Sequence, residues 1–403
     1  MSGFAASSIL MGICSFAAIP IVISTVGLAG WSAIAVGQNV GMILTLIVMF
    51  GLSQAGPEMV SNGPDYVRGS TYVVLLKIRI AIFVALVPAT LFVTWVLATP
   101  NFAAAALAAL SQMMVGVGAS WFFVGERNPS GLLYFDTAPR AVGLMLGSFS
   151  SMVFPNAVVV GAGMVFGAVL ATGLSSIVII RRYPVLSKDR KVTRRDLAMM
   201  WSHHRFGFHT SLLSSISLYL PLLAIQWFAP SAAPSFALVD RLRQQFLVAI
   251  KPVIQFLQGW VPRHDAGETR ERSLVAFKFG MVFSALSFVA YVGVVLLFIR
   301  FFSDEESAVG VWLVVLMAAS VALNVANVSV SLGCFAPLRL NREIAVSAGI
   351  GALVTIVALV PAAIFSGALG VAALGALSQL LTFCYLLVVF RIDSIVYQQK
   401  AHS

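Results

Sequence analysis

Four charged residues lie within one apolar stretch of the chain: Asp240, Arg241, Arg243 and Lys251. The stretch runs over residues 236–262 and reads FALVDRLRQQFLVAIKPVIQFLQGWVP, which is long enough for one membrane-spanning helix. Charged side chains inside a bilayer are costly, so they indicate a functional site or a buried ion pair. Lysine and arginine are the side chains that bind phosphate groups most readily.

The polar residues of this stretch share one face of the predicted helix. At 100° per residue, a sector of about 120° holds six of them: Asp240, Arg243, Gln244, Lys251, Gln255 and Gln258. At 1.5 Å per residue, Lys251 lies about 16 Å from Pro262, close to the bilayer centre. A lysine there must face a cavity or a polar partner, and a structural pair on a neighbouring helix is the alternative.

The other charges of the stretch have simpler alternatives. Arg241 and Arg243 lie nearer the outer interface, where their head groups can reach water. Asp240 can pair with Arg243, three residues further along the helix. If the stripe lines a cavity, its cations suit an anionic cargo such as a pyrophosphate-linked headgroup, and its amides suit sugar hydroxyls.

The composition places the whole chain in a membrane. The 403 residues are 60% hydrophobic and only 10% charged, with a mean hydropathy of +0.97. Soluble domains contain about 25% charged residues. The net charge of +10 therefore marks cytoplasmic loops that face anionic lipid, and it does not indicate a nucleic-acid partner.

The sequence offers no metal site, disulfide framework or cleaved leader. The three cysteines all lie inside apolar runs, and His203, His204 and His209 lack a fourth ligand. No Lys or Arg precedes Arg68, and the first apolar run is too long for a signal peptide. Residues 1–26 are therefore predicted to form the first span.

The fold class predicted is an all-α polytopic membrane protein with about twelve spans. We expect these to start near residues 3, 32, 72, 103, 139, 158, 206, 235, 275, 309, 344 and 369. The fifth and sixth are separated only by Pro155-Asn156. With both termini cytoplasmic, the inner side and adjoining helix ends hold all 25 basic residues except Arg241, Arg243, Lys251 and Arg300, hence 21, among them Lys77 and Arg79.

The basic run at residues 181–204 divides the chain into two predicted six-helix lobes, 1–180 and 205–403. An offset of 201 residues aligns Pro20 with Pro221 and Asn39 with Asp240. Both lobes then start on the inner side, as parallel repeats with a substrate site between them near the midplane. This symmetry adds Gln38 and Asn39 to the candidate binding residues.

Three segments resemble a known family. They are PIVISTVGLAGWSAIAVGQNVGMILTLIVMFGLS, the WFxxGxE pattern within SWFFVGERNPSGLLYFDTAPR, and the D-R-x-R motif followed by two prolines ten residues apart. Together they are similar to polysaccharide repeat-unit (O-antigen, Wzx-type) flippases of the MATE/oligosaccharidyl-lipid/polysaccharide (MOP) exporter superfamily. The sequence departs at Val124, where members often carry Gln, and near Ser24, where many carry a cation.

The resemblance implies transfer of a polyprenyl-pyrophosphate-linked oligosaccharide to the outer leaflet of a bacterial cell membrane, for surface polysaccharide biosynthesis. Alternating access, coupled to a proton or sodium gradient and without another cofactor, would drive it. Lys251, Arg243 and Arg241 would attract the pyrophosphate, and Asp240 would be an ion-coupling or gating carboxylate. Glu126 and Asp136 are expected to be structural. Polysaccharide polymerase or glycosyltransferases are the protein partners that this function implies.

Two other functions remain as alternatives. A multidrug exporter of the same superfamily prefers acidic, aromatic cavities, whereas the charges here are mainly basic. A membrane glycosyltransferase or polymerase needs catalytic residues on sizeable outer loops, and the predicted outer loops are very short. We therefore expect a transporter with no catalytic residue rather than an enzyme.

Overall fold

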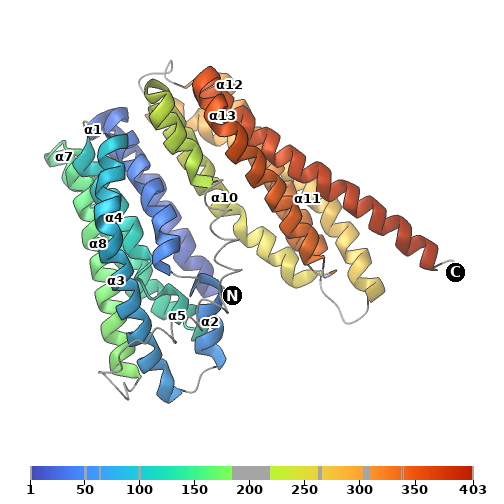
Figure 1. Cartoon of the computed structure of the whole chain (residues 1–403), viewed down its shortest axis with the longest axis horizontal. Helices are drawn as coiled ribbons and strands as arrows, with labels where there is room; N and C mark the ends of the chain where they lie inside the picture. The colour runs from blue at the N-terminus through green and yellow to red at the C-terminus, as the bar shows by residue number, and fades with distance from the viewer. Residues whose placement is uncertain are drawn as a thin grey trace. The chain divides into compact units, whose positions relative to one another are not determined.

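The computed structural model of the chain describes residues 2–49, 52–62, 65–98, 101–183, 218–261, 266–302, 309–336, 338 and 340–401 (Figure 1). All regular elements in these ranges are helices. The chain forms two compact units, Met1–Gln226 and Trp227–Ser403, and each is described by itself. Most of the predicted linker at 181–204 and its surface helix lie outside the described residues, so the predicted lobe boundaries stay a prediction.

The first unit holds the N-terminal helices. They are α1 (Ser2–Met49), α2 (Leu52–Asn62), α3 (Asp65–Leu97), α4 (Phe102–Val115), α5 (Ser120–Gly125), α6 (Pro129–Leu132), the π-helical turn η1 (Leu133–Thr137), α7 (Ala138–Val153) and α8 (Ala157–Arg182). A further apolar helix covers Leu218–Phe228, and most of it belongs to this unit.

The second unit holds the C-terminal helices. They are the short η2 (Pro230–Ala232), α10 (Ala233–Trp260), α11 (Ala266–Phe302), α12 (Val311–Val330), the π-helical turn η3 (Ser331–Phe335) and α13 (Asn341–Ala401). The charged stretch of the sequence is α10.

Seven of the described helical segments are long and apolar enough to cross a membrane. Two of them, Ala6–Met49 and Arg342–Arg391, are 44 and 50 residues long and therefore exceed the roughly 20 residues of one span. Each contains one glycine with a positive φ, Gly27 (φ 72°) and Gly367 (φ 53°), which breaks the helix. These breaks precede the predicted span starts at 32 and 369, while the exact number of spans stays a prediction.

The predicted break between the fifth and sixth spans is confirmed. Helix α7 ends at Val153 and α8 starts at Ala157. The Asn156 side-chain oxygen accepts a hydrogen bond of 2.9 Å from the backbone N–H of Val158, which caps α8. Pro155 and Asn156 thus act as a helix stop followed by a helix start.

Small residues let α1 and α4 touch along their backbones. A Cβ atom on Gly37 would lie 2.1 Å from the Ala105 carbonyl oxygen, and one on Gly41 would lie 2.3 Å from the Ala109 oxygen. Both helices therefore carry small residues four apart at the contact, the pattern that drives close helix packing in membranes. Because the pairs advance in step, this part of α1 runs parallel to α4.

Helices α7 and α8 also pack closely through small residues. A Cβ atom on Gly143 would lie 2.5 Å from the Gly163 oxygen and from the Gly167 Cα atom, and one on Gly163 would lie 2.5 Å from the Gly147 Cα atom. Two Gly-x-x-x-Gly pairs thus face each other across the crossing. No other residue fits these four positions without moving the helices apart.

This packing predicts the outcome of a matched pair of substitutions on α8. Gly163→Leu must separate α7 from α8, whereas Gly173→Leu adds a side chain where nothing lies within 4 Å. We expect Gly163→Leu to lower the free energy of unfolding by on the order of 3 kcal/mol and Gly173→Leu to leave it nearly unchanged. Thermal unfolding of the two purified variants in detergent measures this, and equal midpoints would contradict the crossing.

Candidate functional site

On α10, the side chains of Arg243 and Gln244 donate hydrogen bonds to the carboxylate of Asp240, and these three residues are called the cage below. Asp240 is buried, with 3% of its surface exposed. Its Oδ1 atom accepts hydrogen bonds from Nε and Nη2 of Arg243, at 2.9 and 2.6 Å, and its Oδ2 atom accepts one from Gln244 Nε2 at 2.8 Å. The helical periodicity places these residues at i, i+3 and i+4, so one turn of helix builds the cage.

Tyr291 of helix α11 is the neighbour of this cage. Tyr291 is fully buried and donates a 2.8 Å hydrogen bond from its phenol to the Val239 carbonyl oxygen. Phe246 packs edge-on against the Tyr291 ring, with 5.7 Å between centroids. These contacts, made by Val239 and Phe246, hold this part of α10 against α11.

The structure brings only part of the predicted stripe together. Arg241 is half-buried and its position lies 100° further round α10 than Asp240, outside the sector that holds Arg243 and Gln244. Lys251 and Gln255 lie on the lower half of α10, but their side chains are outside what the structure describes. Their roles therefore stay predictions, as does binding by Arg241, Arg243 and Gln244.

Gln38 and Asn39 lie on α1 in the first unit, and both are 4% exposed. Gln38 Nε2 lies 3.7 Å from the Met164 sulfur, and its Oε1 atom has no hydrogen-bond partner among the described residues. Asn39 Nδ2 donates to the Tyr219 carbonyl oxygen at 3.4 Å. Both amides are thus buried between helices of their own unit.

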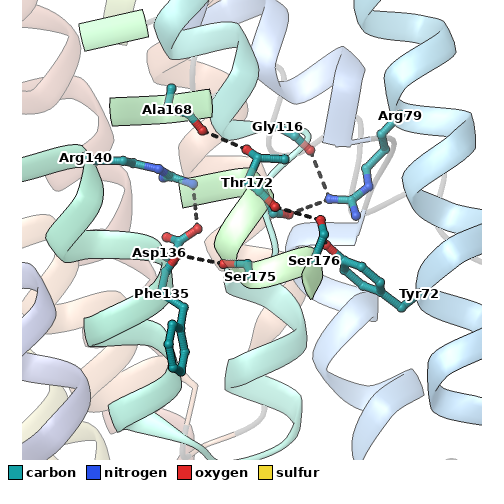
Figure 2. Close-up of polar contacts among 11 residues, drawn as sticks. Tyr72, Arg79, Gly116, Phe135, Asp136, Arg140, Ala168, Thr172, Ser175 and Ser176 are labelled. Carbon is teal, nitrogen blue, oxygen red and sulfur yellow. Dashed lines mark hydrogen bonds and ion pairs between the residues drawn. The ribbon is translucent and has the colours of Figure 1, made fainter. Parts of the chain in front are cut away.

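A second buried charge cluster, which the sequence analysis missed, centres on Arg79 of α3 (Figure 2). Arg79 is 0% exposed, although the orientation argument counts it with the inner helix ends. Its Nη1 atom donates to the carbonyl oxygens of Gly116 and Gly118, at 3.2 and 2.6 Å, and its Nε atom donates to Leu75 at 3.2 Å. Gly116 and Gly118 follow the end of α4, where carbonyl groups lose their helical partners.

Aromatic rings complete the surroundings of Arg79. Its guanidinium carbon lies 5.3 Å from the Trp121 ring centroid, a cation–π contact. Trp121 in turn stacks on Tyr72, with 6.2 Å between ring centroids. The remaining nitrogen, Nη2, has no hydrogen-bond partner among the described residues, so the ring face provides its main electrostatic compensation.

The pair of Asp136 and Arg140 packs against the same Gly116–Gly118 turn. Arg140 Nη2 donates to Asp136 Oδ1 at 2.6 Å, and the two side chains are 15% and 4% exposed. A Cβ atom on Gly118 would lie 2.5 Å from Arg140 Nη2 and 3.2 Å from Asp136 Oδ1. Only a glycine lets the turn fit between this ion pair and Arg79.

Hydroxyl groups of α8 join these clusters to the backbone (Figure 2). Ser176 donates to the Thr172 carbonyl oxygen at 2.7 Å, so the Tyr72 hydroxyl is the donor in its 2.8 Å contact with Ser176. Ser175 donates to the Phe135 carbonyl oxygen at 2.8 Å. The polar groups of this region therefore bond to one another and to helix ends, which indicates a structural role.

The WFxxGxE pattern also has a structural role. Glu126 accepts a 2.7 Å hydrogen bond from the Tyr183 phenol and a 2.8 Å ion pair from Arg182, and Asn128 lies 3.4 Å from its other oxygen. Burial and the hydrogen bond with Glu126 raise the pKa of Tyr183, so the phenol stays protonated and donates. The motif thus fastens the loop after α5 to the end of α8.

The depth of Arg79 within its apolar segment is the feature from which its burial could have been predicted. Arg79 lies 12 residues beyond Val67, the first residue of an apolar segment, and hence about 18 Å along the helix. The same depth argument singles out Lys251. Because Arg79 was assigned only to the inner side, its need for partners within the protein was not predicted.

The described residues contain no group of three or more His, Cys, Asp or Glu side chains that could hold a metal ion. The Arg243 guanidinium and the Asp240 carboxylate of the cage on α10 bind each other.

No family model matches the chain, and no curated protein matches its sequence. Solved structures do share its fold. The lipid II flippase MurJ, in an inward closed conformation, matches with a TM-score of 0.71 at 15% identity, over 96% of this chain and 87% of MurJ. The MATE multidrug transporter DinF-BH matches with a TM-score of 0.61 at 16% identity, over 97% of this chain and 94% of DinF-BH.

These similarities confirm the predicted MOP/MATE-like fold. With its long apolar helices, the chain is a multi-pass membrane protein. By name, the first of these neighbours is a flippase and the second is a transporter.

The Arg79 cluster predicts a large loss of stability from one substitution. Arg79→Met leaves the Gly116 and Gly118 carbonyl groups buried without a donor, at a cost on the order of 3 kcal/mol. Lys77→Met is the matched control, because Lys77 is exposed on the same helix. We expect thermal unfolding in detergent to occur at a clearly lower temperature for Arg79→Met only, and equal midpoints would refute the structural role.

Proposed function

We propose that the chain is a flippase that moves a polyprenyl-pyrophosphate-linked oligosaccharide from the inner to the outer leaflet by alternating access. The observation that carries this proposal is the partly buried Arg243 on α10, whose guanidinium is oriented by the Asp240 carboxylate of the same helix. The fold shared with MurJ, whose name gives lipid II as its cargo, supports a lipid-linked substrate.

The charges of α10 suit a pyrophosphate group. Arg243 presents a planar fork that matches phosphate oxygens, and Lys251 adds a point charge on the same helical face about 12 Å further along α10. Arg241 adds a further cation to the helix. In a site with little water, each charge-assisted hydrogen bond to phosphate contributes about 1.5–3 kcal/mol.

The amides of the predicted site suit the sugar part of the cargo. Gln244 and Gln255 belong to the same face of α10, and Gln38 and Asn39 belong to α1. Amides both donate and accept hydrogen bonds, as sugar hydroxyl groups do. We propose that Gln244 and Gln255 recognise sugar while the cations of α10 hold the pyrophosphate, and that Gln38 and Asn39 are separate candidates within the first unit.

Multidrug export is the competing function, and the fold shared with DinF-BH is consistent with it. The two functions differ in the charge that the site must present. Helix α10 contains three basic residues and one acidic residue, and that acidic residue is already neutralised by Arg243. This balance favours an anionic cargo over a cationic drug.

The proposal places the protein in a bacterial cell membrane, where surface polysaccharide is made. Polysaccharide polymerase or glycosyltransferases would supply or consume the lipid-linked sugar. A proton or sodium gradient would drive the cycle, with no other cofactor. The chain itself would break no covalent bond, because the cargo only changes leaflet.

Lys251→Ala tests this function. The loss of one charge-assisted contact to phosphate predicts a roughly 10- to 100-fold slower transfer of the lipid-linked sugar. Proteoliposomes with a fluorescent polyprenyl-pyrophosphate oligosaccharide measure the transfer, through quenching by a reagent that reaches only one leaflet.

Arg300→Ala is the matched control, since it removes an exposed cation from α11 of the same unit. It should leave transfer unchanged. Full transfer by a well-folded Lys251→Ala protein would remove Lys251 from the site. Export of cationic dyes without any transfer of lipid-linked sugar would favour the multidrug function.

A further inference from the structure

Arg127 has a backbone conformation that side chains rarely adopt. Among the residues that the structure describes, it is the one residue other than glycine with a positive φ, 56°. It follows α5 in a Schellman motif, a helix end whose left-handed position usually holds glycine because glycine has no Cβ atom to clash. The Asn128 N–H donates to the Phe123 carbonyl oxygen at 2.9 Å, which closes this motif. An exposed arginine here strains the fold, so its side chain points to a role outside the fold.

The residue before Arg127 connects this turn to the end of α8. Glu126 Oε1 accepts a 2.7 Å hydrogen bond from the Tyr183 phenol and lies 2.8 Å from Arg182 Nη1. The side chain of Glu126 is 7% exposed and that of Arg182 is 58% exposed, so the carboxylate is the enclosed partner. Arg181 is exposed as well. Three exposed arginines thus lie within one residue of this ion pair along the chain, and one carboxylate leaves two of their positive charges in excess.

Other charged groups near this ion pair do not cancel the excess. The charged groups that act on the Tyr183 phenol are one acid, Glu126, and two bases, Arg68 and Arg182. Arg68 has partners within the protein, because its Nε atom donates to the Val60 carbonyl oxygen at 3.0 Å and its guanidinium carbon lies 5.8 Å from the Tyr183 ring centroid. Arg68 is therefore not counted with the three exposed arginines.

The surface of α8 changes from apolar to basic at this end. Ile177 and Ile180 are exposed near the end of the candidate span Ala157–Arg182, and the two exposed arginines of α8 follow Ile180 directly. Exposed apolar side chains of a spanning helix contact the acyl chains of lipids. The first cations beyond them reach the level of the lipid phosphate groups.

We infer that Arg127, Arg181 and Arg182 form a binding site for the headgroup phosphate of an anionic phospholipid, in the leaflet that the sequence predicts to be the inner one. Guanidinium groups bind phosphate through charge-assisted hydrogen bonds, and a bound phosphate offsets the repulsion among three neighbouring cations. The site belongs to the first unit and does not depend on the cargo proposed for α10.

A membrane lipid fits this surface better than a soluble phosphate does. The arginines adjoin the exposed Ile180, and Tyr134 of η1, which packs against α8, is exposed as tyrosines at membrane interfaces are. Acyl chains gain from these apolar contacts, whereas a soluble phosphate gains nothing from them. A lipid bound here contacts both the turn after α5 and the end of α8.

Arg127→Gly separates the strain at this residue from its charge. The variant removes the Cβ clash of the positive φ, so the full-length protein should unfold at a higher temperature than wild type in nanodiscs of phosphatidylcholine. It also removes one cation of the site. When phosphatidylglycerol replaces half of the lipid, wild type should gain thermal stability and Arg127→Gly should gain less. Thermal unfolding in the two kinds of nanodisc measures both effects.

Native mass spectrometry with phosphatidylglycerol as the titrant gives the lipid affinity. One arginine at an anionic lipid surface changes the affinity by about fivefold. We therefore expect about fivefold weaker binding for Arg127→Gly and on the order of 25-fold weaker binding when Arg181→Gln is added. Arg127→Lys keeps the charge and should bind almost as wild type does. The basic residues of 184–204 are the same in every variant, so their contribution cancels.

Arg300→Ala is the matched control, because it removes one exposed cation from α11 of the other unit. It should leave the gain from phosphatidylglycerol unchanged, and an equal loss in this variant would show a general effect of net charge and overturn the site. Sodium phosphate added to phosphatidylcholine nanodiscs should not raise the midpoint of wild type. A rise equal to that with phosphatidylglycerol would identify a soluble anion as the ligand and overturn the lipid site.

Two further outcomes contradict the inference. Equal affinity for phosphatidylglycerol in wild type, Arg127→Gly and the double variant would show that these arginines do not bind the lipid. A lower midpoint for Arg127→Gly in phosphatidylcholine would show that the arginine stabilises the fold by itself. If the double variant does not fold, Arg127→Gly and Arg181→Gln are measured separately, and each should bind about fivefold more weakly than wild type.

Discussion

A charged side chain inside a bilayer has no water to solvate it, so its partners must come from the protein. Arg79 lies in the candidate span Val67–Leu97, whereas Arg243 lies on α10, which is not one of the seven candidate spans found in the described residues. Arg79 is fully enclosed and bonds to three backbone carbonyl groups and an aromatic ring. Arg243 is partly enclosed and bonds to the carboxylate of its own helix.

The same constraint shapes the backbone. The end of α4 releases carbonyl groups at Gly116 and Gly118, and Arg79 from α3 supplies the donors that water would supply in a soluble protein. Where the helices remain intact, glycine pairs such as Gly143 and Gly147 remove side chains from the contact, so that dispersion forces act between backbones. Burying more apolar surface cannot hold helices together in lipid, so these specific contacts stabilise the first unit.

The sequence predicted those features that depend on composition and on helix-breaking residues. The apolar content required an all-helical membrane protein, and Pro155-Asn156 marked the boundary between α7 and α8. It also placed Asp240 beside Arg243, because helical spacing is local. The partners of Arg79 could not be predicted from the sequence, because Gly116 and Gly118 lie far along the chain and only the tertiary fold brings them to α3. The glycine crossings could not be predicted in the same way, because they depend on which two helices meet and in which register.

The nature of the partner explains why the candidate site belongs to α10 and not to the Arg79 cluster. Backbone carbonyl groups are fixed by the chain and cannot be neutralised, so a ligand that took Arg79 would leave them buried without donors. Arg243 is instead bonded to a carboxylate side chain, which can change its rotamer without a change in the backbone. The partner of Arg243 can therefore be exchanged, whereas the backbone partners of Arg79 cannot. A transporter must bind its cargo and later release it, so the arginine with the replaceable partner is the one suited to the transport site.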